Sequence, residues 1–203
     1  MVGTYHNRIW ESDRVSDKRF NPKHLHKLDS PEREKLLPKE EILAALNIQS
    51  TDTILDLGSG TGYFTIPLAN KTNGTVYGLD VEKEMLLYLK DRFTSEDITN
   101  VELVEGKIEN VPLQDQMVDK VVASMVLHEI EPLKAGLNEI NRLLRKGGRC
   151  LVVEWVKKDA TDGPPKNHRL DADILMKNIK ENGFQNVEIT YSSEEIYVVC
   201  FNK

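Results

Sequence analysis

Hydrophobic residues along this chain gather into short runs, separated by longer segments of mixed character. Seven of these runs have the length and composition of β-strands. They occupy residues 53–57, 75–79, 101–105, 118–124, 149–156, 187–191 and 195–201. The fifth run is apolar except for Arg149 at its start and Glu154, which is typical of a parallel strand covered on both faces.

Between the runs, apolar residues recur with the spacing of amphipathic helices. The pattern predicts helices at residues 38–46, 81–93, 132–145 and 170–182. Strands that alternate with helices predict an α/β fold. We expect a Rossmann-like, doubly wound sheet of seven strands, mostly parallel with an antiparallel C-terminal strand, and helices on both faces.

A glycine-rich turn follows the first strand. Asp56 precedes three glycines at alternate positions, Gly58, Gly60 and Gly62. Glycine lets a ligand lie against the backbone, so a nucleotide-like ligand is the first hypothesis. A dinucleotide-binding loop needs its third glycine where Tyr63 stands, and the Gly-Lys-Ser/Thr ending of a phosphate-binding P-loop is missing. The turn instead resembles the E/D-x-G-x-G-x-G loop of class I S-adenosylmethionine-dependent methyltransferases.

This resemblance implies that S-adenosylmethionine is the cofactor and S-adenosylhomocysteine its product, bound by residues 56–62, Ser59 included. An acidic residue about 20 positions beyond the glycines accepts hydrogen bonds from the ribose hydroxyls, and Asp80, followed by Val81, has this place. Asp80 is also suited to cap the next helix, and both roles are compatible. The family's adenine corner falls at Lys107 and Ile108. Because lysine stands where an acid is usual, we expect a backbone contact at Ile108.

Residues after the fourth strand are candidates for contact with the methyl acceptor. In this family the first and fourth strands flank the point where strand order reverses, so Ser124 is expected to face the cofactor's methyl group. Met125, His128, Trp155 and the N-terminal His24 are candidate acceptor contacts. His128 is the candidate general base, since imidazole titrates near neutral pH. The alternative is a structural histidine beside the cofactor.

Composition limits the other possibilities. A net charge of −6 over 203 residues argues against a broad nucleic-acid surface, and no apolar run approaches the ~20 residues that span a bilayer. Cys150 and Cys200 lie in strand patterns, which indicates buried thiols in a reducing cytoplasm and no metal site. We expect residues 1–37 to form an N-terminal extension or cap and residues 38–203 the methyltransferase domain. The polar loop at 157–169 is expected to act as a substrate lid.

The function that these patterns predict is methyl transfer from S-adenosylmethionine to an unidentified, small-molecule acceptor. Three alternatives stay open at this point. They are methylation of a protein side chain, a methyltransferase-like module that binds the cofactor without catalysis, and a nicotinamide (NAD) oxidoreductase, which Tyr63 disfavours. Neither a nucleic acid nor a membrane is expected as a partner, and the sequence does not indicate the oligomeric state.

Overall fold

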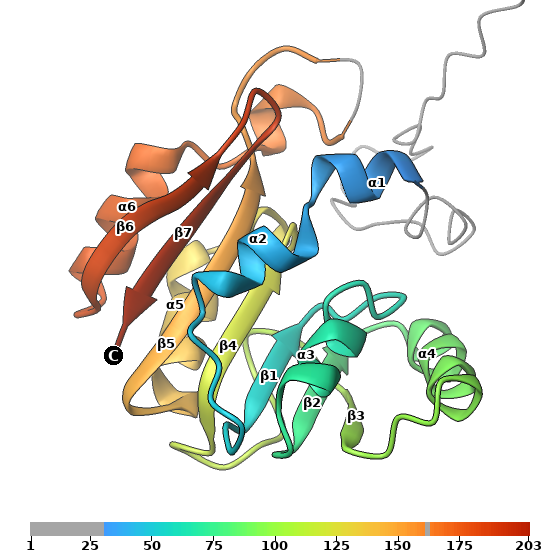
Figure 1. Cartoon of the computed structure of the whole chain (residues 1–203). Coiled ribbons are helices and arrows are strands. Elements are labelled where there is room, and N and C mark those ends of the chain that lie inside the picture. The colour runs from blue at the N-terminus through green and yellow to red at the C-terminus, as the bar shows by residue number, and fades with distance from the viewer. Residues whose placement is uncertain (1–30, 161–162) are drawn as a thin grey trace, which may run out of the picture.

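One seven-stranded sheet organises the computed structural model, which describes residues 31–160 and 163–203 (Figure 1). The strand order is β3-β2-β1-β4-β5-β7-β6. The strands are β1 (Ile54–Leu57), β2 (Val76–Asp80), β3 (Val101–Glu105), β4 (Val118–Ser124), β5 (Leu144–Trp155), β6 (Gln185–Ser192) and β7 (Ile196–Asn202). The α-helices are α1 (Pro31–Leu36), α2 (Lys39–Ala44), α3 (Thr65–Lys71), α4 (Lys83–Ser95), α5 (Leu133–Leu143) and α6 (Ala172–Glu181), and short 3₁₀ turns form η2 (Leu127–Glu129) and η3 (Lys166–His168).

The strand order reverses between β1 and β4. β1 pairs in parallel with β2 on one side and with β4 on the other. β7 pairs antiparallel with both β5 and β6, while the other described pairs are parallel. The predicted doubly wound, mostly parallel sheet with an antiparallel C-terminal strand is therefore confirmed. The carboxyl ends of β1 and β4 lie side by side, where sheets of this kind bind ligands.

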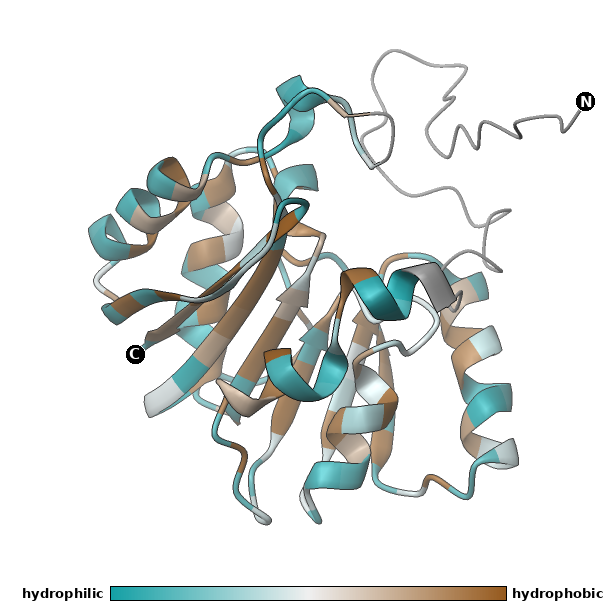
Figure 2. Ribbon diagram, turned by 45° about the horizontal axis from the view of Figure 1, so that its top comes forward, coloured by the Kyte–Doolittle hydropathy of each residue, from teal (hydrophilic) through white to brown (hydrophobic). Residues whose placement is uncertain are grey.

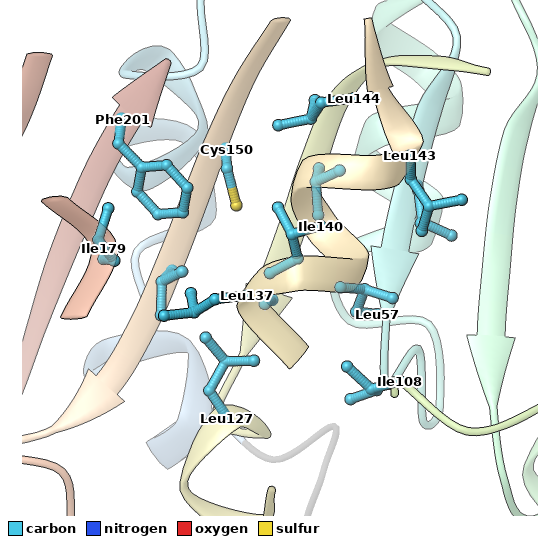
Figure 3. Packing of buried hydrophobic residues seen from close by; sticks show 14 of the residues in the cluster. Leu57, Ile108, Leu127, Leu137, Ile140, Leu143, Leu144, Cys150, Ile179 and Phe201 are labelled. Atoms are coloured by element: carbon cyan, nitrogen blue, oxygen red, sulfur yellow. The ribbon is translucent and has the colours of Figure 1, made fainter. Parts of the chain in front are cut away.

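Helices cover both faces of the sheet. Buried side chains of α2 and α3 pack on one face, and α4 joins α3 there, whereas α5 and α6 pack on the other. Figure 2 shows hydrophobic residues running through the central strands and along one side of the helices. Leu137, Ile140 and Leu143 of α5 are fully buried against the sheet, as Figure 3 shows. The predicted helical spacing is confirmed at Leu137 and Ile140, but Leu144, expected on the same face, begins β5.

The seven predicted strands and four predicted helices are present and differ from the observed ones mainly at their ends, whereas α1 and α3 lie outside the predicted helix ranges. α4 begins at Lys83 because the Asp80 side chain accepts a hydrogen bond from the Glu82 N–H and holds the intervening turn outside the helix. α6 begins at Ala172 because Asp171 caps it, accepting hydrogen bonds from two N–H groups of the first turn. β5 begins at Leu144, which pairs with Val118 before the main register is reached.

The packed structure reaches upstream of residue 38. α1 lies within the segment expected to be an extension, and the Leu37 side chain is fully buried in the cluster that also holds Leu43 and Phe64. The Tyr63 hydroxyl donates a hydrogen bond to the Leu37 carbonyl at 2.6 Å. Tyr63 therefore ties the connection between α1 and α2 to the glycine loop, a structural role for the residue that replaces the third glycine of a dinucleotide-binding loop.

Candidate active site

The glycine loop has a backbone that side chains disfavour. Gly58, Gly60 and Gly62 have φ angles of +72°, +51° and +89°, in the left-handed region where glycine is strongly preferred. A Cβ added at Gly58 would lie 2.9 Å from a methyl carbon of Val126, in the segment after β4. The backbone N–H groups of Gly58 and Ser59 both donate to the Leu79 carbonyl at 2.8 Å. The loop is thus packed tightly between the ends of β2 and β4.

Asp80 joins the end of β2 to this loop. One of its carboxylate oxygens accepts a hydrogen bond from the Gly60 N–H at 2.9 Å, and the other accepts one from the Glu82 N–H at 2.9 Å. Burial raises the pKa of Asp80, while these backbone hydrogen bonds oppose the rise. A carboxylate has about four lone-pair sites, and the backbone N–H groups of Gly60, Val81 and Glu82 do not occupy all of them, so the group can still accept a ribose hydroxyl. Asp80 does not cap α4, whose N-cap is Glu82, so the predicted capping role is wrong; the side chain instead holds the turn before the helix, and its ribose contact stays a prediction.

Asp56 supports the loop from inside the protein. Its side chain is 2% exposed and accepts a hydrogen bond from the Thr65 hydroxyl, in the first turn of α3, at 2.6 Å. Burial raises the pKa of Asp56 to about 7, and the nearby Asp80 adds to the rise, while the Thr65 hydrogen bond opposes it. The Asp56 carboxyl therefore titrates near neutral pH at the centre of the predicted cofactor site.

Two hydroxyl groups at the reversal point indicate that a ligand belongs there. The side-chain oxygens of Ser59 and Ser124 are buried and have no hydrogen-bond partner among the described residues. They follow or end the two central strands, β1 and β4. A buried hydroxyl without a partner costs about 1–3 kcal/mol relative to one that is satisfied. A polar ligand in this position would remove the cost, so both predicted cofactor contacts fit the proposed site.

The predicted adenine corner lies just beyond β3. Lys107 is exposed, whereas the Ile108 side chain is 7% exposed and belongs to the main hydrophobic cluster. The Gly106 N–H donates to the Asp80 carbonyl at 3.1 Å, which links the corner to the residue predicted to bind the ribose. Val81, 37% exposed, follows Asp80. The Ile108 side chain is thus part of the core, and the backbone contact with the adenine expected at this residue stays a prediction.

The chain turns sharply after β4. Met125 has a φ of +55°, an uncommon conformation for a residue with a side chain, and its N–H donates to the Val153 carbonyl at 2.8 Å. Such residues concentrate at functional sites, where the surrounding structure enforces them. Here the turn places Val126 against Gly58 and starts the 3₁₀ turn η2, which carries His128.

His128 and Glu154 form a buried pair. The His128 Nδ1 lies 2.8 Å from one Glu154 carboxylate oxygen, and the other oxygen accepts the His128 backbone N–H at 3.1 Å. The two side chains are 1% and 0% exposed. Glu154 is the polar exception in the apolar run of the fifth strand, a signal visible in the sequence, but the sequence did not indicate its partner.

Trp155 lies beneath the loop at 157–169. It is 9% exposed, the guanidinium of Arg169 stacks 5.3 Å from its ring, and a Cβ at Gly163 would lie 3.0 Å from the ring. Arg169, itself 2% exposed, donates to the carbonyls of Pro164 and Val156. The loop is thus anchored at its base on Trp155, whose role in acceptor binding stays a prediction. His24 lies outside the described residues.

The described residues provide no metal centre and no membrane span. No group of three or more His, Cys, Asp or Glu side chains within 31–160 and 163–203 is arranged to hold a metal ion. Cys150 and Cys200 are fully buried free thiols that belong to the hydrophobic clusters on opposite faces of the sheet. None of the helices described is long and apolar enough to cross a bilayer.

Three known proteins show what the chain is similar to. The demethylmenaquinone methyltransferase of Geobacillus sp. (strain WCH70) is 30% identical over 118 residues, which cover 57% of this chain and 50% of that protein. The arsenite methyltransferase of Halobacterium salinarum is 29% identical over 158 residues, or 70% of this chain and 40% of that protein. The chain thus spans half or less of these relatives. A crystal structure of an S-adenosylmethionine-dependent methyltransferase from Aquifex aeolicus shares the fold, with a TM-score of 0.84 and 24% identity over 91% of this chain and 99% of that one.

The family itself is identified by a match to a family model. A family model described as a methyltransferase domain matches residues 48–197, from before β1 into β7. That span contains the glycine loop, Asp80, the adenine corner and the His128–Glu154 pair. The chain therefore belongs to the methyltransferase domain family, as a class I, S-adenosylmethionine-dependent member.

Proposed function

We propose that this protein transfers the methyl group of S-adenosylmethionine to a small organic acceptor that loses a proton in the reaction. The observation that carries the proposal is the buried His128–Glu154 pair, which follows β4 and ends β5 beside the glycine loop. A histidine held by a carboxylate is a common arrangement for a general base. A small acceptor is also what the names of the two curated relatives describe.

The cofactor site would use residues from three strand ends. The glycine loop would lie against the cofactor, Asp80 would accept the ribose hydroxyls, and the backbone at Ile108 would meet the adenine. The hydroxyls of Ser59 and Ser124 would gain partners. When bound, S-adenosylmethionine supplies a methyl group already activated by a positively charged sulfur. The protein's main task is then to align the acceptor with that methyl group, which in favourable cases is worth about 7–11 kcal/mol.

His128 would take the acceptor's proton. Its ring nitrogen Nδ1 faces the Glu154 carboxylate, which favours the tautomer with the proton on Nδ1. In that tautomer Nε2 is the basic nitrogen. As the imidazole gains a proton, the Glu154 charge stabilises it in a site with little water. The same carboxylate accepts the His128 backbone N–H, so it also fixes the position of η2.

An acceptor that needs no base is disfavoured. Trivalent arsenic, the substrate type named for one relative, binds best to thiolates and reacts through its own lone pair. Both cysteines of this chain are buried on opposite faces of the sheet, so they cannot jointly hold such an atom. Burial also raises the pKa of both thiols, which disfavours the thiolate form. A hydroxyl, an acidic carbon or an amine is the better match to His128.

The test combines binding with methyl transfer. Calorimetry should detect S-adenosylhomocysteine binding to the wild-type protein and none of NAD. Transfer from methyl-labelled S-adenosylmethionine is then measured against hydroxyl, carbon-acid, amine and peptide acceptors, with arsenite as the contrasting substrate. For an acceptor that is methylated, His128→Gln should lower kcat by about a hundredfold or more and leave S-adenosylhomocysteine affinity unchanged.

Each competing function has its own outcome. Binding without turnover of any acceptor would favour a non-catalytic module, and turnover of peptides alone would favour a protein-methylating enzyme. A His128→Gln variant with full activity, or methylation of arsenite alone, would refute the role of His128 as base. A cytoplasmic location, which the buried free thiols support, remains part of the proposal.

A further inference from the structure

Helix α5 holds the segment between β3 and β4 through two charged residues. Glu139, 8% exposed, accepts a hydrogen bond from the Val111 N–H at 2.7 Å. Arg142, one turn later, donates to the carbonyls of Val111 at 2.9 Å and Leu113 at 2.8 Å. It also pairs with Glu139 at 2.6 Å. Both backbone groups of Val111 are therefore fixed by a single ion pair on the helix.

The charges of Glu139 and Arg142 stabilise each other. Burial alone would raise the pKa of Glu139, but hydrogen bonds from Arg142 and Val111 hold that pKa below its usual value. Asp115, in the same segment, forms a second ion pair with Arg142 at 2.7 Å. Two carboxylates thus surround the guanidinium and keep it in one orientation. An arginine fixed in this way can bind two nearby carbonyl groups, here those of residues 111 and 113, with well-defined geometry.

This segment contains the adenine corner. Val111 follows Ile108 by three residues, and both side chains belong to the main hydrophobic cluster. Ile108 also lies close to α5, since a Cβ added at Gly136 would be 3.6 Å from one of its methyl carbons. The Gly106 N–H is bound to the Asp80 carbonyl, but between residues 107 and 113 the described backbone hydrogen bonds are short-range, from Asn110 to Lys107 and from Leu113 to Val111. The attachment of residues 107–113 to a regular element therefore comes from α5.

We infer that Glu139 and Arg142 are positioning residues for the adenine end of the cofactor. Glu139 and Arg142 hold the backbone of residues 107–111 in the position in which Ile108 contacts the adenine. Neither Glu139 nor Arg142 contacts the cofactor itself. The inference rests on the proposed adenine contact at Ile108. The inference explains how adenine can be recognised without an acidic side chain at position 107. A hydrogen bond from the backbone selects adenine only if that backbone is held in one position.

The experiment measures recognition of the base separately from stability. Dissociation constants of S-adenosylhomocysteine and S-inosylhomocysteine, in which oxygen replaces the adenine amino group, are determined for wild type, Glu139→Ala and Glu139→Gln. Glu139→Ala should weaken S-adenosylhomocysteine binding by about tenfold and reduce the preference for adenine over hypoxanthine. Glu139→Gln keeps an acceptor for the Val111 N–H and should recover part of both losses. Hydrogen exchange in residues 106–113 should rise in the same order.

A matched control separates positioning from general destabilisation. Arg149→Ala removes another arginine that bonds a carbonyl, that of Ala45, and a carboxylate, that of Glu188, in a part of the sheet distant from the adenine corner. It should lower the melting temperature without changing the preference for adenine. If Glu139→Ala lowers the melting temperature but keeps wild-type affinity and preference, the pair is only structural and the inference is wrong. If the wild-type protein binds S-adenosylhomocysteine but does not prefer adenine, the contact at Ile108 fails; if it does not bind it at all, the proposed function fails.

Discussion

The buried carboxyl of Asp56 should make the protein less stable as pH rises towards neutrality. In the folded protein, burial raises its pKa from 3.8 to about 7. Between these values the unfolded chain has released the proton and the folded protein still holds it. Because the folded state then binds more protons, the free energy of unfolding falls with pH, by about 1.4 kcal/mol per unit. Over about three units the loss is about 4 kcal/mol, and it levels off above pH 7.

Asp56→Asn removes this titration and keeps an oxygen that can accept the Thr65 hydroxyl. We expect the free energy of unfolding of the variant, measured by urea denaturation without cofactor, to depend less on pH between 4 and 8. As pH rises across that range, the free energy of unfolding of the variant should increase by about 4 kcal/mol relative to that of the wild type. Comparing slopes avoids the constant cost of the new amide group. Parallel curves for the two proteins would refute the reasoning, because they would mean that Asp56 is ionised throughout.

Three further predictions concern the cofactor site and the N-terminal segment. Asp80→Ala should weaken S-adenosylhomocysteine binding by about 1.5–3 kcal/mol in calorimetry, since charge-assisted hydrogen bonds to the ribose are lost; unchanged affinity would contradict its assignment. Lys107→Ala should change that affinity by less than about 1 kcal/mol, as expected for an exposed side chain, and a larger loss would show that the lysine contacts the cofactor. Deleting residues 1–28 should reduce methyl transfer more than S-adenosylhomocysteine binding, because the glycine loop lies elsewhere; full turnover by the truncated protein would show that the segment is dispensable.

The sequence was sufficient to predict the sheet and the backbone conformation of the glycine loop, because both depend on local patterns. Continuous apolar runs predict buried parallel strands, and spacings of three and four predict the buried side of α5. The three glycines predict left-handed backbone, which the φ angles confirm. Element ends were predicted less well. The first residue of a helix is set by side-chain caps such as that of Asp171, and the spacing of hydrophobic residues does not show where a cap forms.

Contacts between distant parts of the chain were beyond local patterns. Tyr63 could be recognised as an exception to a dinucleotide loop, but its bond to Leu37 requires the folded arrangement of α1 and α2. The same holds for Glu139 and Arg142, whose spacing of three suggests an ordinary surface ion pair on a helix. Their position against residues 111–115 depends on how α5 packs on the sheet. The partners in such contacts therefore cannot be identified from the pattern of one element.

Glu154 is a residue for which the sequence alone indicates that a contact with another element must exist. A charged residue in an otherwise apolar strand must find a partner, because an isolated buried carboxylate is far too costly to keep. β5 ends at the edge of the sheet where ligands bind, so the partner of Glu154 has to come from a neighbouring strand end or from a ligand. β4 is that neighbour, and His128 follows it. The requirement to satisfy one buried charge thus links the fold to the residue proposed to accept the proton, and it does so without any knowledge of the acceptor.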